Sequence, residues 1–144
     1  VLQMLSQKLP DFSERNWVSS FRATYFPGAP AAAMDNALGA DFVWSDPKGA
    51  LVKGRPHKRV YLEVKSCTAA EPQPFRMSWN EWALAERCHK TRGPDAELYV
   101  VVVVTGVTTT PQIASLMCDP VQQVKDGLAT VAPSELVVTQ LLAQ

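Results

Sequence analysis

The stretch RVYLEVKS, residues 59–66, decides the fold, because its apolar and polar side chains alternate strictly. This alternation is typical of a β-strand, whose successive side chains point to opposite faces. We therefore expect Val60, Leu62 and Val64 to face a core. Glu63 and Lys65 then project together from the opposite face.

Glu63 and Lys65 are spaced as in a site that binds a phosphate. Two residues along a strand lie roughly 6.5–7 Å apart, close enough for a carboxylate and an ammonium to serve one phosphate or one water. The same spacing predicts no optimal direct salt bridge between them. An ordinary strand with a charged outer face has the same pattern, because Glu-x-Lys tripeptides are common.

Length and composition predict one globular domain without a strong overall charge. The chain has 144 residues, 47% of them hydrophobic, with 14 basic and 14 acidic side chains. A phosphate-binding surface must therefore come from local clustering. The one candidate cluster consists of Lys53, Arg55, His57, Lys58 and Arg59, and a solvated loop is the alternative interpretation.

The cysteines and the apolar segments indicate an intracellular protein. Cys67, Cys88 and Cys118 include no Cys-x-x-Cys pair, so we predict free thiols and neither a disulfide framework nor a zinc site. The sequence has no run of about 18 apolar residues, so no membrane span is predicted. Because the chain begins with Val1, we expect it to be a fragment of a larger protein.

The N-terminal third predicts helices and a loop. Residues 1–12 favour a short helix, and Ser13 is a candidate N-cap for a second helix that ends at Pro27. Residues 27–40 are rich in Pro and Gly and predict a loop. The second helix would carry an apolar stripe of Trp17, Val18, Phe21 and Tyr25.

The remaining chain predicts a sheet that is covered on both faces. Residues 41–45 favour a strand that turns at 46–49 and pairs antiparallel with 59–66. Ser78 and Glu81 match a capping box that opens a helix at 79–91. The unbroken apolar run at 98–104 is typical of a buried strand. We therefore predict an α/β fold with a central mixed β-sheet flanked by helices. Shorter segments follow: a strand at 113–118, a helical turn at 121–125, and a strand or helix start at 136–138.

In order, these blocks resemble the PD-(D/E)XK, or restriction-endonuclease-like, superfamily. More specifically, the segments 38–42, 61–66, 75–82 and 119–120 resemble the uncharacterised domain at the C-terminus of the plant protein NO VEIN. The resemblance spans roughly residues 13–121 and implies a restriction-endonuclease-like core in a single nuclease-like domain over 1–144. Ala40 departs from the superfamily pattern, which has Pro there.

The resemblance implies a Mg²⁺ or Mn²⁺ site that cleaves phosphodiesters. Asp41 and Glu63 would be ligands of the metal, the backbone carbonyl of Val64 a further oxygen ligand, and Lys65 a catalytic residue beside the attacking water. Oxygen ligands of this kind suit Mg²⁺. The first-helix acidic residue of many superfamily members could be Glu14. For Glu81, a capping role and an accessory role beside the site both stay open.

Other polar and aromatic residues favour plainer roles. His57 and His89 lack metal-ligand spacing, so we expect both to be solvent-exposed. Trp79 and Trp82 are interpreted as packing residues.

The leading hypothesis is a metal-dependent nuclease acting on DNA or RNA, with Lys53, Arg55, Lys58 and Arg59 as phosphate contacts. The rival is a catalytically inactive module of the same fold that binds nucleic acid or a protein partner. No membrane partner is expected. The resemblance leaves open a homodimer and flanking helicase or ATPase domains, and the sequence does not distinguish DNA from RNA.

Overall fold

Five consecutive valines, Val100–Val104, form the middle of strand β4 (Glu97–Thr105). β-Branched side chains suit the extended backbone, and alternate valines point to opposite faces. All five are at most 4% exposed, so both faces of the strand are covered. This confirms the buried strand predicted at 98–104.

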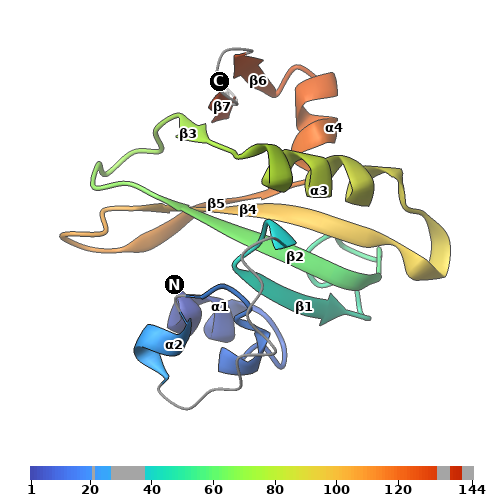
Figure 1. Cartoon of the computed structure of the whole chain (residues 1–144), viewed down its shortest axis with the longest axis horizontal. Helices are drawn as coiled ribbons and strands as arrows, with labels where there is room; N and C mark the ends of the chain where they lie inside the picture. Colours follow the sequence, from blue (N-terminus) through green and yellow to red (C-terminus); the bar gives the residue numbers. More distant parts are fainter. Residues whose placement is uncertain (21, 27–37, 133–136, 141–144) are drawn as a thin grey trace.

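The central sheet of this computed structural model has four strands in the order β1-β2-β4-β5, within the described residues 1–20, 22–26, 38–132 and 137–140 (Figure 1). β1 (Phe42–Asp46) and β2 (His57–Ser66) pair antiparallel, as predicted. β2 and β4 pair parallel, and β4 pairs antiparallel with β5 (Gln112–Cys118). A parallel pair needs a crossover connection, which contains α3 (Trp79–Lys90) and the 3₁₀ turn η4 (Gly93–Asp95).

Helices cover both faces of this sheet, so the predicted mixed α/β fold is confirmed. On one face, α1 (Leu2–Lys8) and the segment after it pack Leu5, Leu9 and Phe12 against the even-numbered residues of β2 and β4. On the other face lie α3 and α4 (Pro120–Lys125), as Figure 1 shows. The core there includes Tyr61, Leu84, Ala85, Cys88, Tyr99, Val101, Val103, Met117 and Val121.

A second, smaller sheet was not predicted. It has the order β3-β7-β6, built from β3 (Phe75–Arg76), β6 (Ala129–Ala132) and β7 (Val137–Gln140). For the segment at 136–138 the sequence left strand and helix open; residues 137 and 138 lie in a strand, and residue 136 lies outside the described residues. These strands are too short to give a clear periodic pattern, and their pairing joins segments far apart in sequence.

The helix predicted from Ser13 to Pro27 is wrong. Ser13 does cap a helix, but only the 3₁₀ turn η1 (Glu14–Asn16), and a separate short helix, α2, spans Arg22–Tyr25. Between them the backbone follows the sheet edge: Val18 N donates to Asp41 O at 2.8 Å. Asn16 Nδ2 also donates to Val43 O at 2.8 Å. These hydrogen bonds to Asp41 and Val43 take the place of the hydrogen bonds that a helix would form within itself.

Three predictions of exposure or packing are also wrong. His57 is 8% exposed, because it starts β2 opposite Asp46. His89 is half-buried, and its Nδ1 lies 2.9 Å from Asp119 Oδ2. Trp79 is 76% exposed, whereas Trp82 packs against the core as expected. Local sequence patterns could not predict these outcomes, because the burial of both histidines depends on partners from other segments.

Some predictions concern residues outside the described ranges, and the prediction about the cysteines is confirmed. Most of the loop predicted at 27–40, and Phe21 of the predicted stripe, lie outside the described residues. The three cysteines are free thiols, as predicted. No helix in the described ranges is long and apolar enough to cross a membrane.

Candidate active site

Asp41 is fixed at the start of β1 by hydrogen bonds to both neighbouring segments. Its N–H donates to Leu62 O at 2.9 Å, which continues the β1-β2 ladder by one residue. Its carbonyl accepts from Val18 N and, more weakly, from Ser19 N. The backbone therefore has little freedom, and the carboxylate is held at the edge of the sheet.

The Asp41 carboxylate takes the place of a β1 residue opposite Val64. Val64 N donates to Asp41 Oδ2 at 3.0 Å. Within a strand, the N–H and C=O of one residue point toward the same side, so the Val64 carbonyl also points toward the Asp41 edge of β2. The predicted metal ligands Asp41 and Val64 are therefore neighbours.

Lys65 joins Glu63 to Glu81 at the start of α3. Its Nζ lies 2.9 Å from Glu63 Oε1 and 2.9 Å from Glu81 Oε2. The prediction that Glu63 and Lys65 are too far apart for a direct ion pair is wrong, because the long lysine side chain folds back along the strand. All three side chains are at most 17% exposed, so this charged group is largely withdrawn from water.

Glu81 has the capping role and also lies beside the site. Its Oε2, which contacts Lys65, also accepts from Ser78 N at 2.9 Å, and Ser78 Oγ accepts from Glu81 N. The capping box therefore brings a second carboxylate to Lys65. The capping role that the sequence left open for Glu81 is confirmed, and an accessory role beside the site stays a prediction.

The site carries excess negative charge. Burial raises the pKa of Glu63 to about 8, and the neighbouring Asp41 and Glu81 carboxylates add to this, while Lys65 opposes it. Burial alone would lower the pKa of Lys65, but its hydrogen bonds to Glu81 and Glu63 and their charges leave it raised. Lys65 therefore stays a cation, facing more carboxylates than it can neutralise.

Tyr99 anchors the loop that carries Asp41. The phenol, on β4, is 1% exposed and donates to Gly39 O at 2.8 Å. Gly39 has φ +78°, and a Cβ there would lie 3.0 Å from the Asn80 carbonyl, so the loop packs directly on the start of α3. Burial, followed by the charges of the three carboxylates, raises the pKa of Tyr99. The sequence indicated only a strand residue here.

These groups open into a polar cavity of about 370 Å³. Asp41 and Glu63 line it from the sheet, and Glu81 lines it from the start of α3. Ser19, Ser20, Ser78 and Asn80 also line the cavity, and sequence reasoning did not single out Ser19, Ser20 or Asn80 for the site. Their small polar side chains carry no distinctive spacing, so only the tertiary structure brings them here.

A comparison with protein-family models identifies the family of the chain. A family model described as Protein NO VEIN, C-terminal matches residues 22–116. The chain belongs to this family. Comparisons with curated proteins and with solved structures gave no match. The matched range runs from α2 into β5, so Asp41, Glu63, Lys65 and Glu81 all belong to the NO VEIN C-terminal domain.

The donors in this NO VEIN C-terminal domain fit a hard divalent cation. Asp41 Oδ1 and Glu63 Oε2 accept no hydrogen bond within the described part of the chain, and the Val64 carbonyl points the same way. Mg²⁺ prefers such oxygen ligands and keeps several waters. Among the described residues, no three His, Cys, Asp or Glu side chains are grouped to hold a metal. A cation here would rest on two carboxylates and a backbone carbonyl.

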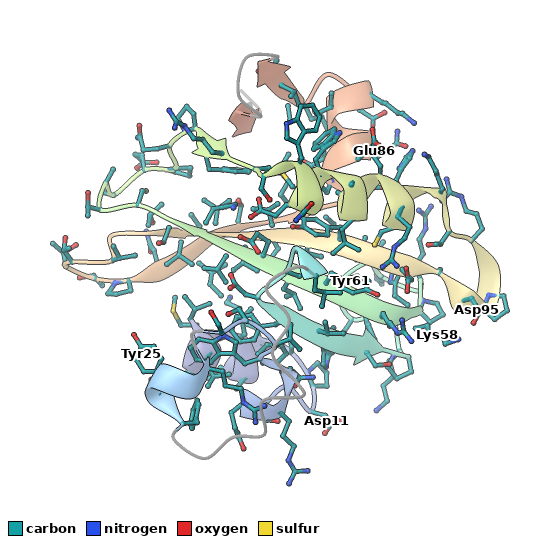
Figure 2. The ribbon with its side chains drawn as sticks, in the orientation of Figure 1. Asp11, Tyr25, Lys58, Tyr61, Glu86 and Asp95 are labelled. Atoms are coloured by element: carbon teal, nitrogen blue, oxygen red, sulfur yellow. The ribbon has the colours of Figure 1, made fainter. Side chains whose placement is uncertain are left out.

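The predicted basic cluster lies at the other end of β2. Lys58 and Glu63 are five residues apart, about 16 Å along a strand. Lys58 pairs with Asp95 at 2.7 Å, well away from the cavity, and Figure 2 shows this pair at one end of the molecule. Arg59 lies 3.7 Å from Glu97. Lys53 and Arg55 belong to the exposed β1-β2 connection, so the structure does not bring these four residues to the carboxylates.

Glu14 is also separate from the cavity. It is exposed at the start of η1, and it is not among the described residues that line the polar cavity. Two accessory residues were considered from the sequence. The structure places Glu81 beside the polar cavity and Glu14 away from it.

Proposed function

We propose that this domain is a metal-dependent phosphodiester hydrolase acting on DNA or RNA. The observation that carries the proposal is that Asp41 and Glu63, from adjacent strands, line one cavity next to a buried Lys65 cation. Two carboxylates, a backbone carbonyl and an ammonium are the groups that divalent-metal hydrolysis of phosphodiesters uses. The resemblance to the PD-(D/E)XK superfamily supports the same reaction.

The chain's own residues would divide the chemistry as follows. Asp41, Glu63 and the Val64 carbonyl would hold Mg²⁺ or Mn²⁺, which supplies a water of lowered pKa and offsets charge on the phosphate. Lys65 would orient the attacking water or stabilise the negative charge that develops on the phosphate oxygens. Glu81 would position Lys65, because its own orientation is fixed by the Ser78 amide.

The second candidate is a nuclease-fold module without catalytic activity. It is favoured by one observation: Lys65 Nζ is held by two carboxylates at 2.9 Å each, as in a purely structural ion network. In that case the domain would bind a nucleic acid or a protein partner and leave it intact.

Cleavage of labelled single- and double-stranded DNA and RNA in Mg²⁺ or Mn²⁺ tests the proposal. The native domain should cut at least one of the four substrates, and EDTA should abolish cutting. Lys65→Ala should lower the rate by a factor of about 10² or more, since it removes electrostatic stabilisation of the reacting phosphate.

A matched control is Lys90→Ala, which removes an exposed lysine from the end of α3. It should leave cleavage unchanged. Cleavage that survives Lys65→Ala would remove Lys65 from the mechanism. If native protein binds a substrate but never cuts it, the inactive module is the better description.

A further inference from the structure

A second hollow adjoins the candidate active site on the other side of Asp41. It has a volume of about 610 Å³, and Asp41 and Val64 line it together with the rings of Trp17, Tyr25 and Phe42. Asp41 also lines the polar cavity. The two hollows therefore meet at a residue proposed to hold the metal.

The walls of this hollow are aromatic. The Trp17 and Tyr25 rings are stacked, with centroids 5.6 Å apart and an interplanar angle of 29°. Trp17 also contacts Phe42, with centroids 5.4 Å apart, and Phe26 edge-on. Tyr25 is nevertheless 67% exposed, and Figure 2 shows it at the periphery of the molecule on α2. A large aromatic face is thus presented to solvent beside the site.

Trp17 connects the aromatic and polar walls physically. Its Nε1 donates to Ser19 Oγ at 2.7 Å, and Ser19 lines the polar cavity. The backbone N–H of Ser19 in turn contacts the Asp41 carbonyl. A ligand that spans both hollows would meet flat rings on one side of Asp41 and the carboxylates of Glu63 and Glu81 on the other.

One kind of ligand has this combination of groups. A nucleotide within a strand joins a planar aromatic base to a phosphate, and bases stack on aromatic side chains without regard to sequence. The bases of a duplex are paired and stack on each other, so a base enters such a hollow at the lowest free-energy cost from a single strand or an unpaired end.

We propose that the aromatic hollow binds an unpaired base next to the phosphate held at Asp41, so that the substrate is single-stranded or has a single-stranded end. This inference rests on the proposed function and specifies its substrate class. Tyr25 and Trp17 would stack on the base, and Ser66 at the polar rim would contact its edge.

Fluorescence anisotropy with labelled oligonucleotides of equal length tests the base hollow, with Ca²⁺ replacing Mg²⁺ to slow cleavage. The probes are a single strand, a blunt duplex and a single strand with abasic sites. Tyr25→Ala should weaken binding of the normal single strand about 5- to 100-fold. Tyr25→Phe should keep the affinity, because it keeps the ring. Leu128→Ala, which truncates a half-exposed side chain beyond α4, should change nothing.

The abasic strand separates base stacking from backbone contact. Tyr25→Ala should not change its affinity, and the native domain should bind it more weakly than the normal strand. Equal losses for normal and abasic strands, or no loss for either, would overturn the inference. Cleavage that needs Lys65 but not Tyr25 would overturn the inference alone, whereas failure to cut any substrate would overturn the proposed function.

Discussion

At the scale of single residues, Asp41 does most to define the site. Its backbone extends the β1-β2 ladder, while its carboxylate accepts the Val64 amide and lines the polar cavity together with Glu63. A residue placed only for structure would need the hydrogen bond but not the charge. This difference can be measured.

Asp41→Asn should leave the metal-free domain at least as stable as the native one. The amide oxygen can still accept from Val64 N, and repulsion with Glu63 is removed. With Mg²⁺ or Mn²⁺ at about 100 times its dissociation constant, native protein should gain roughly 2.7 kcal/mol in free energy of unfolding, and the variant should not. Thermal melts with and without metal measure both effects. Identical native melts at millimolar metal would count against the metal site.

Glu63 should make stability depend on pH. Its pKa is raised from 4.5 to about 8, so between these values the folded state binds more protons than the unfolded state. The stabilisation is fully present below pH 4.5 and is lost as the pH rises through the folded pKa, with a slope of at most about 1.4 kcal/mol per pH unit.

Urea unfolding of the metal-free domain across this range measures that slope. Glu63→Gln should flatten it, because the titrating group is gone. Glu86→Gln, at an exposed position on α3 that Figure 2 labels, should keep the native slope. A native slope that Glu63→Gln leaves unchanged would show that other groups cause the pH dependence.

At the scale of elements, the start of α3 combines folding with the site. Ser78→Ala should lower the free energy of unfolding by about 1 kcal/mol, because Glu81 N loses its acceptor. Ser78→Thr keeps the hydroxyl and should recover most of this. Chemical denaturation of native protein, Ser78→Thr and Ser78→Ala checks this order of decreasing stability. Equal stability of Ser78→Ala and native protein would mean that water caps the helix equally well.

The β1-β2 connection depends on glycine at one position for steric reasons. Asp46 is 1% exposed, and its carboxylate accepts from Ala50 N and Leu51 N, which holds the turn tightly. At Gly49, φ is +65° and a Cβ would lie 2.6 Å from Arg55 N. The predicted turn at 46–49 is confirmed by the hydrogen bond from Gly49 N to Asp46 O.

Gly49→Ala should therefore destabilise the domain more than Gly54→Ala. Both glycines have a positive φ, at +65° and +73°, but a Cβ at Gly54 meets nothing within 4 Å. The Gly54 variant should lose about 1–2 kcal/mol from backbone strain, and the Gly49 variant clearly more. Unfolding curves give the difference in free energy of unfolding between the two variants, and this difference measures the cost of the clash at Gly49. Equal losses would show that the loop moves to relieve it.

At the scale of the whole molecule, the central sheet lies between two layers of helices. We expect the cores on its two faces to contribute equally to the free energy of unfolding. Val101 faces the α3 core and Val102 the α1 core, and both are fully buried. Val101→Ala and Val102→Ala should each lower the free energy of unfolding by roughly 2 kcal/mol. Urea denaturation checks this. A negligible loss for either variant would indicate that its face is poorly packed.

The sequence predicted the central elements well because their signals are local. Alternation marked β2, an unbroken valine run marked β4, and a capping box marked α3. The second helix, from Ser13 to Pro27, was predicted wrongly, because hydrogen bonds to Asp41 and Val43 outweigh local helical preference after Ser13. The small sheet and the burial of His57 likewise depend on partners far along the chain.

By itself, the sequence indicated the candidate groups: Asp41 at the start of a predicted strand, assigned through the family resemblance, and Glu63 and Lys65 on one face of the next strand. Only the tertiary structure decided how they are used. In the folded chain, Lys65 pairs with both Glu63 and Glu81. The basic cluster lies at the far end of β2, and an aromatic hollow lies beside Asp41. The reason is physical: alternation fixes the direction of a side chain within its strand, but burial, charge and contacts depend on segments that meet only in the folded chain.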